Sequence, residues 1–205
     1  DIPERYPAEL AEFDGIDSSN GGERSRAYVL HFSGPFWQLR EWCGLENLCM
    51  LMVDDPGFVQ EMIDFWADFV LQTLKPILKR VVPDFVQVAE DMAYKMHSMI
   101  SPAMTRRFLL PVWQGWVDKI KASGCRIVSI DSDGYMAELM ALWIEAGFNC
   151  CFPVEVAAGN DIVAFRRQYG RQMAYLGGLD KRALAAGGGI EAVPGQGFTR
   201  GGQAR

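Results

Sequence analysis

A repeated unit constrains the fold of this chain more than any other feature of its sequence. The unit is a short run of β-forming residues, a polar or glycine-containing turn and an amphipathic helix, and it recurs along the chain. Its apolar runs are nearly continuous, as in parallel strands that are buried on both faces. They predict strands at Tyr28–Phe32, Asp84–Glu90, Arg126–Asp131, Asn149–Val154 and Met173–Gly177. Strands that alternate with helices predict an α/β fold with a parallel sheet and right-handed crossovers.

Proline and glycine mark the ends of the predicted helices. Asp55-Pro56 and Ser101-Pro102 each place a capping residue before a proline at the first helical position. In the first of these helices, Pro76 should introduce a kink or end the regular part. The second should stop at Gly124. Two more helices are predicted, from about Tyr135 to Gly147 and from Asn160-Asp161 to about Tyr169. The apolar stripe expected along the first helix consists of Phe58, Met62, Phe65, Phe69 and Val70.

The two ends of the chain differ from the repeating region. Residues 1–27 are polar and predict a mobile loop segment, while residues 187–205 form a glycine-rich tail that we expect to be disordered. The domain is therefore expected at residues 28–186. Periodicity alone leaves a barrel and an open doubly wound sheet as alternatives. No G-x-G-x-x-G or G-x-x-x-x-G-K-[ST] motif is found in the sequence to support a nucleotide-binding open sheet.

Composition limits the partners and the compartment. The net charge is −6 and no basic stripe is present, which argues against nucleic acid as a partner. Charges interrupt the apolar stretches too often for a membrane span. None of the five cysteines forms a C-x-x-C pair, so we expect reduced thiols in a cytoplasmic protein.

Acidic residues gather where the predicted strands end. In parallel β/α folds, ligands bind at the C-terminal ends of the strands. Each carboxylate taken alone has an ordinary explanation as a turn residue or a helix cap. Together they predict a functional rim, on which mutual repulsion raises some pKa values unless a metal or a cationic ligand offsets the charge. The six carboxylates are Glu90, Asp91, Asp131, Asp133, Glu155 and Asp180, with Lys95, Lys181 and Arg182 as nearby cations.

Histidines and tryptophans add candidates near this rim. His31 ends the first predicted strand and His97 lies in the loop after the second, and an imidazole at either place is a candidate acid–base group. Trp37 and Trp42 follow the first strand and are candidates for an aromatic wall against a flat ligand. No Cys or His accompanies Asp131 and Asp133, so an oxygen-ligand site for a hard cation fits this pair better than a zinc–thiolate site.

Several of these segments together resemble the uroporphyrinogen decarboxylase superfamily over residues 28–186. The motifs are Glu90-Asp91-Met92-Ala93-Tyr94-Lys95, Ile100-Ser101-Pro102, Phe108-Leu109-Leu110-Pro111, Asp131-Ser132-Asp133-Gly134, Glu145-Ala146-Gly147, Pro153-Val154-Glu155, Tyr169-Gly170 and Gly177-Gly178-Leu179-Asp180-Lys181-Arg182-Ala183-Leu184. The resemblance implies a partial (β/α)8 TIM barrel with about five βα units, in which the first two units and the last are not represented.

The resemblance implies three hypotheses about function. The first is a decarboxylase-like lyase of porphyrin metabolism that acts without a cofactor on a tetrapyrrole or another carboxylated small molecule. Its expected catalytic residues are Asp91, Asp133 and Glu90, and its substrate-binding residues His31, Trp37, Trp42, Lys95, Gly178 and Asp180. An acidic rim would, however, repel such a substrate.

The second hypothesis is an enzyme similar to the corrinoid-linked methyltransferases. Asp131-x-Asp133 stands where those enzymes have a His-x-Cys zinc ligand pair, so Asp131, Asp133 and Glu155 would hold a divalent cation instead. The third is a barrel fragment that is inactive alone. A homodimer is also expected among the partners.

Overall fold

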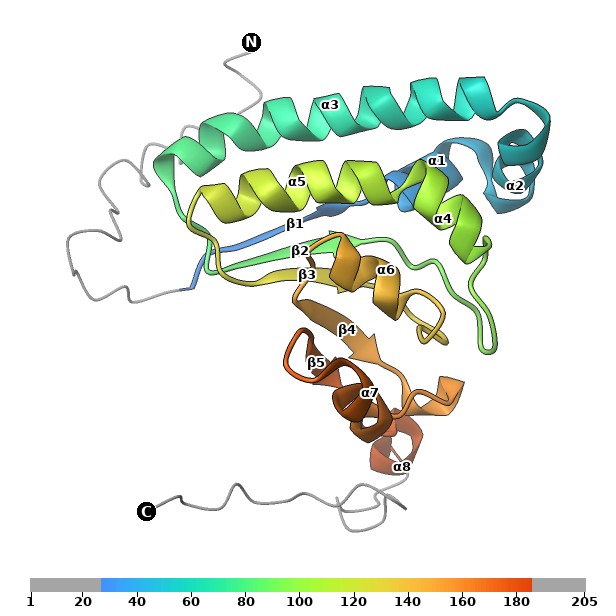
Figure 1. Cartoon of the computed structure of the whole chain (residues 1–205), viewed down its shortest axis with the longest axis vertical. Coiled ribbons are helices and arrows are strands. Elements are labelled where there is room, and N and C mark those ends of the chain that lie inside the picture. Colours follow the sequence, from blue (N-terminus) through green and yellow to red (C-terminus); the bar gives the residue numbers. More distant parts are fainter. Residues whose placement is uncertain (1–26, 186–205) are drawn as a thin grey trace.

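The computed structural model describes residues 27–185, which form a five-stranded parallel sheet covered by helices (Figure 1). The strands are β1 (Val29–Ser33), β2 (Phe85–Ala89), β3 (Val128–Asp131), β4 (Cys150–Val154) and β5 (Ala174–Gly177), and they lie side by side in chain order. Every predicted strand is found, with boundaries that differ by at most two residues. Because a doubly wound sheet reverses its strand order and a barrel does not, the fold is a partial (β/α)8 barrel.

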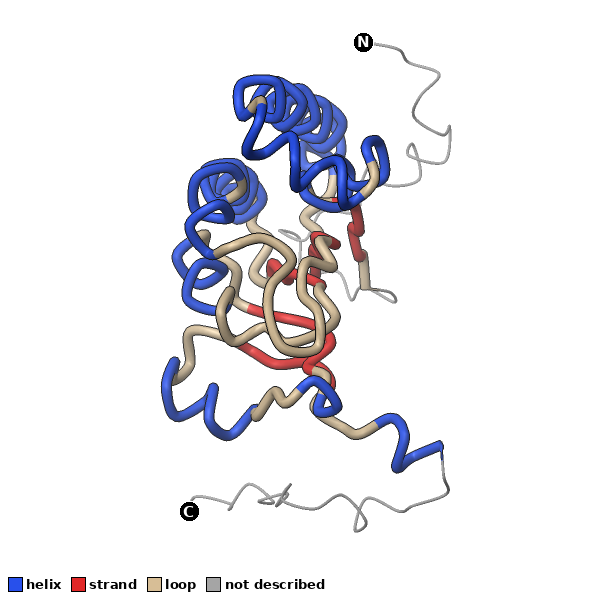
Figure 2. Tube along the Cα trace, turned by 90° about the vertical axis from the view of Figure 1, so that its right-hand side faces the viewer, coloured by secondary structure: helices blue, strands red, loops and turns tan. Residues whose placement is uncertain are grey.

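The helices lie mainly on one side of the strands (Figure 2). They are α1 (Pro35–Cys43), α2 (Leu45–Asp54), α3 (Pro56–Arg80), α4 (Pro102–Phe108), α5 (Leu110–Ala122), α6 (Met140–Glu145), α7 (Ile162–Tyr169) and α8 (Lys181–Ala185), with a 3-10 turn, η4, at Val156–Ala158. Helices α3 and α5 run side by side over β1, β2 and β3 (Figure 1).

Side-chain caps begin three of these helices where the sequence predicts. The Asp55 carboxylate accepts a hydrogen bond from the Phe58 N–H at 3.0 Å, and the Ser101 hydroxyl accepts one from the Met104 N–H at 3.2 Å. Asp161 accepts from the N–H groups of Val163 and Ala164 at the start of α7. Each cap satisfies a backbone donor that the first turn of a helix leaves without an intrahelical partner.

Other helix predictions were wrong in detail. The segment predicted as one helix from Ser101 to Gly124 is divided at Leu109 into α4 and α5. Pro111 accounts for the division, because its ring nitrogen has no hydrogen to donate to the preceding turn. Helix α3 continues through Pro76 to Arg80, so its regular part does not end at this proline, and α6 is shorter than the predicted helix from Tyr135. The two helices between β1 and α3 were not predicted.

The apolar stripe predicted on α3 is also partly wrong. Phe58 and Phe65 are 46% and 65% exposed, whereas the buried face consists of Val59, Ile63, Val70 and Leu74. The helix therefore has apolar residues on two faces. Only one of these faces contacts the core in the described part of the chain.

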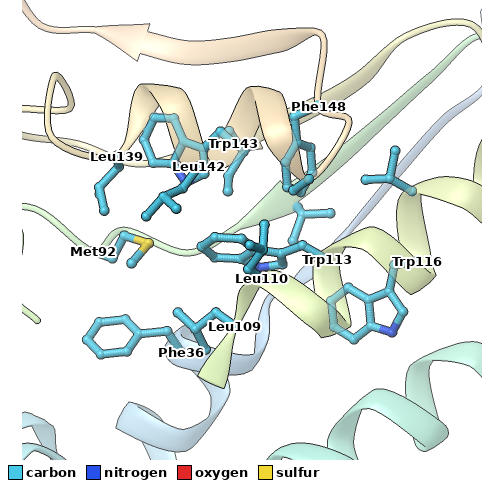
Figure 3. Close-up of a cluster of buried hydrophobic side chains, with 14 of the residues drawn as sticks. Phe36, Met92, Leu109, Leu110, Trp113, Trp116, Leu139, Leu142, Trp143 and Phe148 are labelled. Atoms are coloured by element: carbon cyan, nitrogen blue, oxygen red, sulfur yellow. The ribbon is translucent and has the colours of Figure 1, made fainter. Parts of the chain in front are cut away.

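The core lies between the outer face of the sheet and the helices α3, α5 and α6. Trp113, Trp116 and Trp143 are almost completely buried in it, together with Phe148 (Figure 3). Alternate strand residues such as Val86 and Val88 point into this core. Because side chains alternate along a strand, Gln87 points to the opposite face, which is the interior of the barrel.

Other sequence predictions concern the cysteines and the ends of the chain. Cys43, Cys49, Cys125, Cys150 and Cys151 are free thiols, and the last three are buried. None of the helices in residues 27–185 combines the length and the hydropathy that a membrane span requires. The predicted loop at 1–27, apart from its last residue, and the predicted disordered tail at 187–205 lie outside the described residues.

A candidate active site at the C-terminal ends of the strands

The parallel strands bring predicted site residues from β2, β3 and β4 to one rim. Asp91 follows β2, Asp131 ends β3, Asp133 follows it, and Glu155 follows β4. Asp133 is close enough to Asp91 and to Glu155 for their charges to raise its pKa, and Asp131 is affected in the same way by Asp91 and Asp133. The predicted clustering of these four carboxylates is confirmed.

Glu90 lies behind this rim. Its side chain is fully buried, and its two carboxyl oxygens accept hydrogen bonds from Trp113 Nε1 at 2.6 Å and from the Trp37 N–H at 3.0 Å. A Cβ at Gly34 would overlap its carboxyl group, so the glycine makes room for it. Burial raises the pKa of Glu90 to about 8, although these hydrogen bonds and the charge of Arg40 act in the opposite direction. Glu90 joins the first turn of α1 to α5 and exposes no surface, and the catalytic role predicted for it stays a prediction.

Arg40, which the sequence analysis did not select, holds Asp91 at the rim. Its guanidinium donates to the backbone oxygen of Asp91 at 2.7 Å and to Asp91 Oδ2 at 3.2 Å. Asp91 has a φ of 40°, which is unusual for a residue other than glycine and costs free energy that surrounding contacts must offset. The guanidinium also lies 4.6 Å from the centroid of the Trp37 ring. Trp37 and Asp91 are thus positioned by the same side chain.

Asp131 faces the barrel interior beside a glutamine that the sequence analysis also missed. Gln87 Nε2 donates to Asp131 Oδ2 at 2.6 Å, and His31 lies opposite Gln87 in the register of β1 and β2. Burial raises the pKa of Asp131, as do the charges of Asp133 and Asp91, whereas the Gln87 hydrogen bond and His31 oppose the shift. A visible signal for Gln87 is that it alone is polar in the apolar run Phe85–Ala89.

Asp133 borders a hollow of about 380 Å³ at the rim. The hollow is lined by Ala93, Tyr94, Lys95, Asp133, Gly134, Glu155, Ala157, Ala158 and Arg182. Burial raises the pKa of Asp133 most, and Glu155 and Asp91 raise it further, while Lys181 lowers it. The hollow combines a carboxyl group that retains its proton more readily than usual with the cations of Lys95 and Arg182.

Backbone contacts fix one wall of this hollow. Ala93 and Ser98 form an antiparallel bridge, so residues 93–98 make a small hairpin after β2. A Cβ at Gly134 would overlap the backbone oxygen of Ala93, and the Tyr135 N–H donates to the backbone oxygen of Tyr94 at 2.7 Å. Glu138 accepts hydrogen bonds from the backbone and the hydroxyl of Ser98.

His97 contacts Glu138 as well. Its Nδ1 lies 3.0 Å from Glu138 Oε1, and its side chain is largely exposed. His97 therefore supports the hairpin from outside the hollow.

Three rim carboxylates are neutralised by ion pairs. Asp91 pairs with Arg40, Glu155 with Lys181 at 2.5 Å, and Asp180 with Arg182 at 3.1 Å. Within residues 27–185, no such ion pair is found for Asp131 or Asp133. The electrostatic objection to an anionic substrate is therefore weaker than the sequence suggests.

The predicted metal ligands are not arranged as a metal site. Among the described residues, no three His, Cys, Asp or Glu side chains are placed to hold a metal ion. The oxygens of Glu155 instead accept hydrogen bonds from Lys181 and from the Gly134 N–H at 3.0 Å. Asp131, Asp133 and Glu155 thus do not fit a divalent cation in the observed geometry.

Two residues predicted to bind substrate lie elsewhere. Trp42 packs against α3, with its ring centroid 5.8 Å from Trp66 and 6.2 Å from Phe65. Gly178 has a φ of 75°, and a Cβ there would overlap the Ile162 side chain at the start of α7. Trp42 lies in α1 and Gly178 in the loop between β5 and α8, and neither of them lines the hollow.

The singly wound parallel sheet and its strand-end site define the class of the protein as an α/β-barrel domain. The sequence matches the uroporphyrinogen decarboxylase (URO-D) family over residues 32–193, and the chain belongs to this family. A solved methyltransferase from Methanosarcina mazei has a similar structure, with a TM-score of 0.62 and 14% sequence identity. The alignment covers 82% of this chain and 47% of the methyltransferase, so the chain spans about half of that protein's length. No curated protein matches the sequence.

Proposed function

We propose that the protein is a decarboxylase-like lyase of the URO-D family that acts on a carboxylated small molecule of the tetrapyrrole type. The observation that carries the proposal is the pair Asp131 and Asp133. Both are partly buried at the rim, both have raised pKa values, and within residues 27–185 neither has an ion-pair partner. A carboxyl group whose pKa is raised above its ordinary value keeps its proton more readily, which favours a role in general acid catalysis.

The residues around the hollow can take distinct parts in such a reaction. Lys95 is the cation that would bind a substrate carboxylate at its border, whereas Arg182 already pairs with Asp180. During decarboxylation, the bond between the substrate carbon and its carboxylate carbon breaks, and the electron pair stays on the substrate carbon. Protonated Asp133 would donate a proton to that carbon as carbon dioxide leaves, and solvent would then reprotonate Asp133. Asp131 accepts a hydrogen bond from Gln87 and would offset changes of charge on the substrate from the barrel interior.

The test is turnover of uroporphyrinogen, prepared by chemical reduction of uroporphyrin, with stepwise loss of carboxyl groups followed by mass spectrometry. The variant Asp133→Asn should lower turnover by about 100-fold or more, which is the usual contribution of a general acid. The control Asp118→Asn changes an exposed carboxylate on α5 and should retain full activity. Equal activity of Asp133→Asn and the parent protein would refute the assigned role.

The methyltransferase-like alternative and the inactive-fragment alternative make different predictions. The first requires a divalent cation, and the engagement of Glu155 by Lys181 counts against it. The second predicts a broad thermal transition, since an incomplete barrel leaves sheet edges and core exposed. A cytoplasmic location remains our prediction from the free cysteines.

A further inference from the structure

Arg40 contacts the chain on both sides of the hairpin at residues 93–98, which forms one wall of the hollow. Its Nη1 lies 2.7 Å from the backbone oxygen of Asp91, before the hairpin, and 3.5 Å from Met99 Sδ, after it. The two sides are joined at this level, because the Met99 N–H donates to the backbone oxygen of Met92 at 2.8 Å. The guanidinium of Arg40 therefore lies at the base of the hairpin, where it leaves the end of β2.

Helix α1 fixes the position of this arginine. The Gly34 N–H at the start of the helix donates to the backbone oxygen of Ala89 at 2.7 Å, and the Trp37 N–H donates to the Glu90 carboxyl group. Arg40 follows Trp37 by three residues and lies on the same face of α1, so the two side chains are neighbours. Both ends of this short helix are thus joined to the end of β2.

The contacts of Arg40 depend on the shape of the guanidinium as well as on its charge. Its planar group donates to the backbone oxygen and to Oδ2 of Asp91, while it also lies 4.6 Å from the centroid of the Trp37 ring. A lysine has a single ammonium group and cannot reproduce all three contacts. The side chain of Arg40 is only 15% exposed, so water cannot readily replace them. Asp91 needs such contacts, because its φ of 40° is unfavourable.

We propose that Arg40 is a positioning residue of the candidate active site, which holds the base of the hairpin and thereby places Tyr94 and Lys95 at the hollow. The inference rests on the proposed function, in which Lys95 binds a carboxylate of the substrate. Arg40 acts from outside the residues that line the hollow. When its contacts are lost, the hairpin moves relative to Asp133, so substrate binding weakens while the proton donor stays in place.

Amide hydrogen exchange of the full chain, followed by NMR without ligand, tests the positioning directly. The amides of Tyr94 and Met99 are both hydrogen-bonded within the hairpin or at its base, and in Arg40→Met they should exchange about 10-fold faster or more. The amide of Val86 is hydrogen-bonded within the sheet and should change by less than about 3-fold. Unchanged exchange of the hairpin amides would overturn the proposal. Equal acceleration of all three amides would overturn it as well, because Arg40 would then only stabilise the fold.

Steady-state kinetics with uroporphyrinogen test whether the position of the hairpin matters for the reaction. Arg40→Met should raise KM by about 10-fold or more and lower kcat by less than about 3-fold, and Arg40→Lys should lie between this variant and the parent. The matched control Arg107→Met removes an exposed arginine of α4 whose guanidinium also lies over an aromatic ring, that of Phe108 at 4.8 Å. This control should leave both constants unchanged.

The two measurements separate failure of this inference from failure of the proposed function. A parent protein that does not turn over uroporphyrinogen would refute the proposed activity, and the exchange of the hairpin amides would still decide the role of Arg40. Turnover by the parent with an unchanged KM in Arg40→Met would overturn the proposal. A loss of kcat alone would overturn it too, because Arg40 would then act on the chemical step and not on substrate binding.

Discussion

The buried carboxyl group of Glu90 should make the stability of the protein depend on pH in a direction opposite to that of an ion-paired carboxylate. The pKa of Glu90 is about 8 in the folded protein, compared with an ordinary value of 4.5. Because the folded state holds this proton more tightly, its contribution to stability is complete at low pH and is lost as the pH rises through 8. Between pH 5.5 and pH 8.0 the loss of stability is about 3 kcal/mol. It accumulates at about 1.4 kcal/mol per pH unit, and the slope becomes smaller near pH 8, where Glu90 of the folded protein also loses its proton.

The variant Glu90→Gln removes this titration. Its amide cannot accept both hydrogen bonds, since one oxygen is replaced by a donor that faces Trp113 Nε1 or the Trp37 N–H. We expect the variant to be about 1 to 3 kcal/mol less stable than the parent at pH 5.5. At pH 8.0 the difference should disappear or change sign, because only the parent loses stability through this group.

Urea unfolding at the two pH values measures these free energies. All other titrating groups are shared, so they cancel when the variant is compared with the parent. The control Glu46→Gln changes an exposed residue of α2 and should stay within about 0.5 kcal/mol of the parent at both pH values. If the difference between parent and Glu90→Gln is the same at pH 5.5 and pH 8.0, the reasoning about burial is wrong.

Three further predictions concern the rim. Gly134→Ala should lower the free energy of unfolding in urea by more than about 2 kcal/mol, because φ is 81° and the new Cβ meets the backbone of Ala93. As a control, Gly115→Ala in α5, where nothing lies within 4 Å, should raise it by about 0.5 to 1 kcal/mol. Gln87→Leu should raise the pKa of Asp131 further, because it removes a hydrogen bond that favours the charged form. Carboxyl NMR titration measures this pKa, and an unchanged or lowered value would contradict the prediction. Calorimetric titration with Mn²⁺ should show no binding tighter than about 1 mM, and tighter binding would favour the methyltransferase-like alternative.

The strands and the helix starts could be predicted because they depend on local patterns. Buried parallel strands require continuous apolar runs, and Asp55 and Ser101 cap the helices whatever surrounds them. The two faces of α3 could not be distinguished in this way. Both are apolar at helical spacing, and only the neighbouring helix α5 and the sheet decide which of them is buried.

Individual site residues were predicted less well, because position along a strand gives the height of a residue in the barrel but not the direction of its side chain. Glu90 and Asp91 are adjacent at the end of β2, yet the first is fully buried and the second reaches the rim. Arg40 was missed because its role depends on the turn of α1 over the end of β2. Gln87 had a usable signal, a single polar residue in an apolar strand.

The hairpin at Ala93–Ser98 has a consequence for how the binding site can change during evolution or design. Its position depends on backbone contacts with Gly134 and Tyr135 and on Glu138, none of which needs a particular side chain at Tyr94 or Lys95. The frame of the hollow is therefore independent of the groups that would contact a ligand. New side chains at these two positions can alter ligand selectivity while the scaffold keeps its stability, so they are the natural places to begin a library for new substrates.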